Sequence, residues 1–252
     1  TLPSSSTRMC CRNKAPEKVK SETELIFVSV ADKNQLVHKS EQSVLGQGAF
    51  GKVHLVRMKK GIGDEYALKQ LPLQKVQSEQ IMDQVLVERD VMFSCGTHPY
   101  VIKLFSFWQT KESLNFFMEY SSGGDMFDHV RKNAKLPAEE AARYTFQMAQ
   151  ALDFLGEKKV IFRDLKLENV LINHEKQSIL LADFGLAKQF SGKHQHRTTK
   201  TICGTIQYMA PEILKGEAYG REVDWWSLGV LGFLMSVGRY PYSKGFEKLA
   251  FD

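Results

Sequence analysis

The charged segment 162–169 constrains this chain more than any other, because it concentrates polar groups between two apolar runs. It places an acid, a lysine and an amide within six residues, from Asp164 to Asn169. The apolar runs on either side, 160–161 and 170–172, predict short buried strands. Polar groups this dense would each need a buried partner in a core loop. We therefore interpret the segment as a loop that carries a functional site.

A second acid stands at the end of a second apolar run. Residues 180–182 lead directly into Asp183. Carboxylate and amide oxygens are the ligands that Mg²⁺ takes in proteins, usually together with phosphate oxygens of a substrate. Asn169 and Asp183 are therefore predicted to bind metal ions beside a polyanion. This leaves Asp164 as a candidate base.

The glycine-rich segment 46–51 has a spacing that dinucleotide-binding proteins also use, but in those proteins the glycines open a helix. Here residues 52–57 alternate with period two and include β-branched side chains, so the glycines are predicted to join two strands of a hairpin. This excludes the dinucleotide-binding interpretation. Glycines at the tip of a hairpin let the backbone approach phosphate oxygens without a Cβ in the way.

Five patterns occur together and in order, and their joint occurrence is not expected by chance. They are Gly46-Gln47-Gly48-Ala49-Phe50-Gly51-Lys52-Val53, Tyr66-Ala67-Leu68-Lys69, Arg163-Asp164 ending in Asn169, Asp183-Phe184-Gly185, and Ala210-Pro211-Glu212. With these patterns the chain resembles a eukaryotic protein kinase from about Val44 to Asp252, roughly four fifths of its length.

The resemblance implies an α+β, bilobal protein-kinase fold. A small antiparallel β-sheet lobe with one helix is expected at about 41–119, a hinge at about 119–123, and a mainly helical lobe at about 124–252. The family has further helices beyond this point, so the helical lobe is expected to be incomplete. Residues 1–40 are polar and basic and are predicted to form a disordered leader.

Three stretches resemble the AGC group of kinases, and the last is most similar to the ribosomal-protein kinases. They are Arg163-Asp164-Leu165-Lys166-Leu167-Glu168-Asn169, Gly123-Gly124-Asp125-Met126-Phe127, and Cys203-Gly204-Thr205-Ile206-Gln207-Tyr208-Met209-Ala210-Pro211-Glu212. Two positions depart from that group. Phe162 replaces the usual tyrosine and is expected to stack on Phe184, and Leu234 stands where relatives carry an acid for a substrate arginine.

The resemblance implies an ATP site and two Mg²⁺ ions. Lys69, held by Glu88, would orient the α and β phosphates, and Lys166 would lie near the transferred group. Asn169 and Asp183 would bind Mg²⁺, and Asp164 would accept the proton of the substrate hydroxyl. The residues expected around the nucleotide are Gly46, Gln47, Gly48, Ala49, Phe50, Gly51, Val53, Ala67, Lys69, Met118, Glu119 and Ser121.

The resemblance also implies a regulatory position and a substrate site. Thr201 matches the AGC activation threonine, and a phosphate there would pair with Arg163, so an upstream activating kinase is expected. Asp125 and Glu168 would receive arginines of a serine or threonine protein substrate, and Thr205 is also expected at the substrate site.

Hydrophobic periodicity predicts the remaining elements. Strands are expected at 65–71, 103–108 and 114–120, and helices at 78–93, 138–156 and 221–237. In the helix 138–156 the predicted apolar face consists of Ala142, Phe146, Ala149 and Leu152.

Composition limits the partners. The net charge of +5 is mild, and no long stretch interleaves basic and aromatic residues, so nucleic acid is not an expected partner. A cytoplasmic location is expected, with the nucleus as an alternative, and a membrane is expected only if Cys10 and Cys11 are acylated. The alternative function is a weakly active or inactive pseudokinase that acts as a binding module.

Overall fold

The structure is a computed structural model, and it describes residues 8–9, 36–38, 44–48, 51–58, 65–190 and 198–242. The strands are β1 (Arg8–Met9), β2 (Leu36–His38), β3 (Val44–Gln47), β4 (Lys52–Met58), β5 (Glu65–Pro72), β6 (Leu104–Gln109), β7 (Ser113–Glu119), β8 (Val160–Ile161), β9 (Val170–Asn173), β10 (Ser178–Leu181), β11 (Lys188–Gln189) and β12 (Gly204–Thr205). The helices are α1 (Leu73–Ser78), α2 (Met82–Cys95), α3 (Met126–Asn133), α4 (Ala138–Glu157), α5 (Pro211–Leu214) and α6 (Glu222–Val237), with 3₁₀ turns η2 (Leu167–Asn169) and η3 (Ile206–Tyr208).

Residue contacts divide the chain into two compact units. The sheet unit comprises Lys14–Thr97 and Ile102–Tyr120, and the helical unit comprises Thr1–Asn13, His98–Val101 and Ser121–Asp252. Two strands, β1 and β2, fall within the predicted leader, and the rest of that leader, with Cys10 and Cys11, lies outside the described residues. Within the described ranges, no helix has the length and apolar character needed to cross a membrane.

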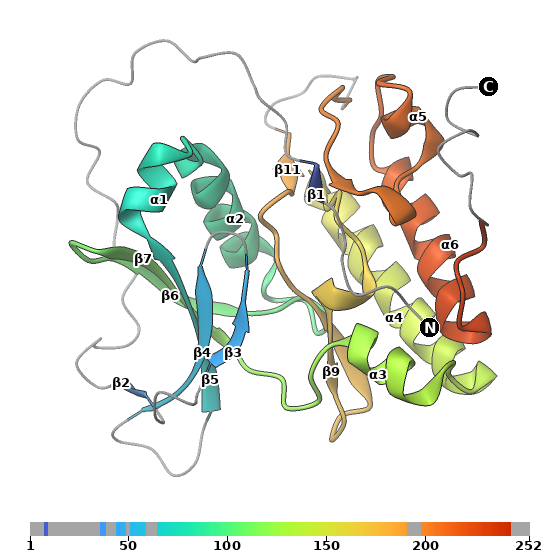
Figure 1. Cartoon of the computed structure of the whole chain (residues 1–252), viewed down its shortest axis with the longest axis horizontal. Helices are drawn as coiled ribbons and strands as arrows, with labels where there is room; N and C mark the ends of the chain where they lie inside the picture. Colours follow the sequence, from blue (N-terminus) through green and yellow to red (C-terminus); the bar gives the residue numbers. More distant parts are fainter. Residues whose placement is uncertain are drawn as a thin grey trace. The chain divides into compact units, whose positions relative to one another are not determined.

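The sheet unit is built on one antiparallel sheet. β4 pairs with β2, β3 and β5, and β5 continues through β7 to β6. The predicted hairpin of β3 and β4 and the three predicted strands are therefore confirmed. The helices α1 and α2 pack against this sheet, α1 on β5 and β7 and α2 on β6 (Figure 1).

A helix is present where 78–93 was predicted, but it begins four residues later than predicted, and Ser78 belongs to a separate preceding helix. α1 ends at Ser78 and α2 begins at Met82. Between them Gln80 has φ 53°, a left-handed conformation that cannot continue an α-helix. The break turns Ile81 inward, where it is buried. The polar run around it carries no signal that distinguishes a left-handed residue from a helical one.

The helical unit is organised by α4 and α6, which pack side by side (Figure 1). Both helices were predicted with bounds that differ from the observed ones by one residue at an end. The predicted face of α4 is wrong, however, since Phe146 is 64% exposed and only Leu152 of that set is buried. The face that packs carries Ala141, Tyr144, Met148, Ala151 and Leu155. Three of these residues lie one position before residues of the predicted face.

The charged loop lies between short strands, as predicted. β8 pairs with β11, and β9 pairs with β10 in an antiparallel hairpin. All side chains from Leu165 to Leu167 are buried, and Phe162 meets Phe184 edge to face with ring centroids 4.9 Å apart. The expected contact between these two aromatic rings is confirmed. These strands and rings fix both ends of the loop on the body of the helical unit.

Candidate active site

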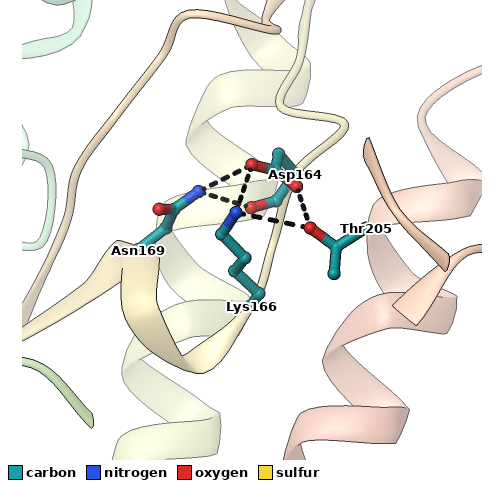
Figure 2. Close-up of polar contacts among 4 residues, drawn as sticks. All are labelled: Asp164, Lys166, Asn169 and Thr205. Carbon is teal, nitrogen blue, oxygen red and sulfur yellow. Dashed lines mark hydrogen bonds and ion pairs between the residues drawn. The ribbon is translucent and has the colours of Figure 1, made fainter. Parts of the chain in front are cut away.

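Asp164 lies at the centre of a buried polar cluster in the helical unit (Figure 2). Its Oδ1 accepts a hydrogen bond from Thr205 Oγ1 at 2.8 Å, and its Oδ2 lies 2.9 Å from Lys166 Nζ. Asn169 Nδ2 donates to Oδ2 at 3.1 Å and to the Asp164 carbonyl at 2.9 Å. Lys166 Nζ also donates to Thr205 Oγ1 at 3.3 Å. Four residues predicted from the sequence are thus brought together around one carboxylate.

The predicted metal ligands lie at the ends of two adjacent backbone segments. The Ala182 amide donates to the Asn169 carbonyl at 2.9 Å, which places the residue before Asp183 beside Asn169. Asn169 uses its amide nitrogen toward Asp164, so its Oδ1 is the atom left to bind a metal. Asp183 has φ 63°, and strained residues of this kind cluster at functional sites. An amide oxygen and a carboxylate are donors that fit Mg²⁺.

Asp224 holds the start of the loop and was not predicted from the sequence. Its carboxylate accepts hydrogen bonds from the backbone amides of Phe162 and Arg163, both at 2.8 Å. Arg163 has φ 67°, so this bond stabilises a left-handed residue immediately before Asp164. Burial raises the pKa of Asp224, and the hydrogen bonds from the two amides partly oppose this rise, which leaves the pKa at about 6. Asp224 stands between Val223 and Trp225 in the predicted helix 221–237, and an acid flanked by apolar residues is a signal that could have identified it.

Replacing Asp224 by asparagine should remove a specific pH dependence of stability. The folded chain holds the Asp224 proton more tightly than the unfolded chain, because the pKa is about 6 rather than 3.8. Stability therefore falls as the pH rises from about 4 to about 6 and is level above that. Between pH 5 and pH 7 the wild type should lose about 1 kcal/mol relative to Asp224→Asn, measured by urea unfolding. If the unfolding free energies of the two proteins changed in parallel with pH, the raised pKa of Asp224 would be refuted.

The sheet unit contains the predicted lysine and glutamate as a pair. Lys69 Nζ, on β5, lies 2.6 Å from Glu88 Oε1, on α2. The side chains are 19% and 5% exposed, so the pair is largely shielded from water. Lys69 also lies 5.7 Å from the ring centroid of Phe116. The lysine is therefore fixed in direction rather than free to move at the surface.

Some of the glycines predicted around the nucleotide are required by packing, and others have open space around them. Gly46 and Gly48 are exposed, and a Cβ on either would meet no atom within 4 Å. Gly51 is required by packing, because a Cβ there would lie 2.1 Å from the Gln70 carbonyl oxygen. Ala49 and Phe50 lie outside the described residues.

The remaining predicted nucleotide residues lie on or next to the strands. Val53 pairs with Lys69, and Ala67 pairs with Met118. The Glu119 amide is used in the sheet, where it donates to the Lys103 carbonyl at 2.9 Å. Ser121, in the helical unit, uses its hydroxyl to bind the Ile172 carbonyl at 2.6 Å. The Glu119 amide and the Ser121 hydroxyl are therefore already engaged. A contact of either residue with a nucleotide would have to use its other backbone atoms.

Thr201 lies in a network of hydroxyl groups beside two cations. Its Oγ1 is 3.2 Å from Thr199 Oγ1, which accepts a hydrogen bond from Lys188 Nζ at 3.0 Å. Burial lowers the pKa of Lys188, and the positive charge of Arg163 lowers it further. Arg163 donates from Nε to the Leu186 carbonyl, but its buried Nη1 has no partner in the described part of the chain.

The predicted substrate acids lie at two ends of helical turns. Asp125 caps α3, where its carboxylate accepts a hydrogen bond from the Asp128 amide at 2.8 Å. Glu168 lies in η2, directly beside the Asp164 cluster. Burial raises the pKa of both carboxyl groups, and the charge of Asp125 adds to the rise at Glu168. Thr205, the third predicted substrate residue, is bonded to Asp164 as described above.

Comparison with known proteins identifies the family to which the chain belongs. Residues 39–251 match the family described as "Protein kinase domain". Protein kinase C zeta type from Oryctolagus cuniculus is 43% identical over 199 residues, which are 79% of this chain and 33% of that protein. Atypical protein kinase C from Drosophila melanogaster is 42% identical over 199 residues, or 79% and 32% of the two chains.

A human relative has a similar sequence identity to the chain. Protein kinase C eta type from Homo sapiens is 40% identical over 209 residues, which are 83% of this chain and 30% of that protein. The chain therefore spans about a third of the length of the curated relatives it matches. The α+β fold with an antiparallel sheet and a helical part, expected from the sequence, is confirmed.

Proposed function

Because the chain belongs to the protein kinase domain family, we propose that it transfers the γ-phosphoryl group of ATP to a serine or threonine hydroxyl of a protein. The observation that carries this proposal is the buried cluster in which Thr205, Lys166 and Asn169 all contact the Asp164 carboxylate. A carboxylate held by three donors in one orientation is suited to accept a proton from a hydroxyl at a fixed place.

Each residue of the cluster has a separate task in the proposed reaction. Asp164 accepts the hydroxyl proton as the new oxygen–phosphorus bond forms, and Lys166 compensates negative charge on the transferred group. Thr205 keeps the carboxylate oriented toward the substrate. Asn169 and Asp183 would hold Mg²⁺, which supplies the positive charge that neutralises phosphate oxygens when it is bound.

The sheet unit would hold the nucleotide. In this proposal the exposed glycines of the β3–β4 hairpin leave room for phosphate oxygens, and Val53, Ala67 and Met118 offer apolar surface to adenine. Lys69, fixed by Glu88, binds the α and β phosphates.

Phosphorylation of Thr201 by an upstream kinase is the proposed activating step. The unpaired Nη1 of Arg163 and the ammonium of Lys188 support it, because a phosphate brings an anion with several acceptor oxygens. The substrate is proposed to carry arginine near its hydroxyl residue, received by Asp125 and Glu168. The closer likeness to ribosomal-protein kinases and the cytoplasmic or nuclear location remain predictions.

ATP and Mg²⁺ together should raise the melting temperature of the chain by several degrees. Ligand at about a hundred times its Kd stabilises a protein by about 2.7 kcal/mol, and each kcal/mol is worth about 2–4 °C in a chain of this size. In Asp183→Asn the shift with Mg²⁺ should fall to the shift seen with ATP and EDTA. The surface variant Asp153→Asn is the control, since Asp153 is 64% exposed.

The same protein samples decide between a kinase and a binding module. Incorporation of radioactive phosphate into a serine peptide supports the kinase. A full thermal shift without incorporation, in chain phosphorylated at Thr201, would instead favour the pseudokinase alternative. Absence of any shift would argue against both.

A further inference from the structure

The amino-terminal strand β1 pairs with β12, a strand that lies far along the chain. In the antiparallel register Arg8 stands opposite Thr205, and Met9 stands opposite Gly204. The two strands form a two-stranded sheet of their own, and β1 belongs to the helical unit rather than to the sheet unit (Figure 1). Backbone pairing therefore attaches β1 to the unit that carries the Asp164 cluster.

β12 is in direct contact with the loop that carries Asp164. Thr205 Oγ1 donates to Asp164 Oδ1 at 2.8 Å and accepts from Lys166 Nζ at 3.3 Å. Gly204 has φ 113°, and a Cβ there would lie 2.6 Å from the Arg163 carbonyl oxygen. Glycine is the residue that allows the backbone of β12 to approach the loop this closely. A segment that pairs with β12 is therefore brought beside the carboxylate that is proposed as the base.

The edge of β12 suits an extended segment of polypeptide. β12 is two residues long, η3 begins directly after it at Ile206, and among the described residues β1 is its strand partner. A sheet edge offers backbone N–H and C=O groups, so an added strand binds mainly through its own backbone. β1 is thus a segment of the chain itself that is placed as a bound peptide would be.

A hydroxyl side chain directly precedes β1. Residues 4–7 are Ser4-Ser5-Ser6-Thr7, and Thr7 is bonded to Arg8. Thr7 itself lies outside the described residues. Consecutive Cα atoms are about 3.8 Å apart and paired Cα atoms about 5.5 Å, so covalent geometry keeps the Thr7 Cα within about 9 Å of the Thr205 Cα. Because Arg8 and Met9 carry no hydroxyl, Thr7 is the hydroxyl residue nearest to the paired residues along the sequence.

We propose that Thr7 is a phosphorylation site that the chain modifies in its own molecule, because the pairing of β1 with β12 presents the amino-terminal segment to Asp164 as a substrate. The inference rests on the proposed kinase function. The Thr7 hydroxyl oxygen forms a bond to the γ-phosphorus of ATP while the bond between that phosphorus and the bridging oxygen breaks, and ADP leaves with the electron pair. The hydroxyl proton passes to Asp164.

A reaction within one molecule differs in kinetic order from modification of a separate protein. A short link between substrate and site gives an effective concentration in the millimolar range, whatever the concentration of the chain. Transfer between two molecules has no such advantage, and its rate per molecule falls in proportion to dilution. The fraction of Thr7 modified per minute should therefore be independent of the concentration of the chain.

The test follows phosphate on the tryptic peptide 1–8 by mass spectrometry after the full chain is mixed with ATP and Mg²⁺. The fraction modified per minute should stay constant when the chain is diluted about a hundredfold, whereas transfer between molecules would slow about a hundredfold. Thr7→Val should remove the phosphate from this peptide, and Ser6→Ala should retain it. A rate that falls in proportion to dilution overturns the inference.

The double variant Arg8→Pro with Met9→Pro tests the part played by β1. Proline has no backbone N–H to donate to β12. The rate at Thr7 should fall at least about fivefold, the scale for one lost backbone hydrogen bond. The matched control, Asn13→Pro with Lys14→Pro, places two prolines outside β1 and should keep the wild-type rate. An unchanged rate at Thr7 in the β1 variant overturns the inference.

Hydrogen exchange gives a readout that needs no phosphoryl transfer. The backbone amides of residues 204–205 should exchange at least about threefold faster in the β1 double-proline variant than in the wild type. Equal exchange overturns the inference. Phosphate on an added serine peptide without phosphate on Thr7 also overturns it and leaves the kinase function standing. If neither gains phosphate while residues 204–205 are protected, the kinase function fails, and the modification of Thr7 by this chain fails with it.

Discussion

Asp164→Asn is expected to lower kcat for peptide phosphorylation by about 10² to 10⁴, the range that a general base contributes. Asparagine has nearly the same shape and can still accept from Thr205, so the chain should fold. It removes the negative charge that pairs with Lys166 at 2.9 Å and the carboxylate that is proposed to accept the hydroxyl proton. The KM for ATP should change less than threefold, because the proposed nucleotide contacts come from other residues. Initial rates at varied ATP and peptide measure both constants.

The matched control for Asp164→Asn is Asp153→Asn, which should leave kcat unchanged. Asp153 lies on α4 with its nearest cation, Arg221, at 4.0 Å, and both side chains are well exposed. Retention of more than a tenth of the wild-type kcat in Asp164→Asn would contradict the role of this carboxylate as the base. A parallel loss in the control would indicate a general effect of the substitution on the fold.

Residue patterns alone predict positions whose chemistry and neighbours are local, whereas the distant pairs Lys69–Glu88 and Phe162–Phe184 were expected through the resemblance to protein kinases. Asp164, Lys166 and Asn169 lie within six residues, so any turn brings them close, and the structure joins them directly. Alternation over residues 52–57 was enough to distinguish a hairpin from a helix. In each case the signal and the contact lie on the same short segment.

Contacts between distant segments could not be predicted in the same way. Asp224 meets the backbone of Phe162 across 62 positions, and nothing in either segment alone indicates the partner. The face of α4 that packs was missed because alanines and aromatic residues occur on two sides of the helix. Which side is buried depends on α6, which lies much further along the chain. Tertiary packing therefore determines which face of α4 is buried, and the periodicity of its sequence does not.

Lys69→Met is expected to lower the phosphorylation rate at least about a hundredfold and also to destabilise the sheet unit. Removing a charge proposed to bind the α and β phosphates of ATP costs about 10² to 10³ in rate. The substitution also removes the cation 2.6 Å from the buried Glu88 carboxylate, at a cost of roughly 1–3 kcal/mol in unfolding free energy. The control is Arg57→Met in the same sheet, whose ion pair with Glu65 is 47% and 27% exposed. It should cost at most about 1 kcal/mol and leave the rate unchanged.

The double variant Lys69→Met with Glu88→Leu separates the two effects. Replacing both members of a buried ion pair by apolar residues of similar size is often neutral or stabilising, because neither charge is then left in the interior. The double variant should therefore regain most of the stability that Lys69→Met loses, by urea unfolding, while its phosphorylation rate stays at least about a hundredfold below wild type. If activity returned together with stability, the pair would serve the fold alone, and the lysine would have no role at the phosphates.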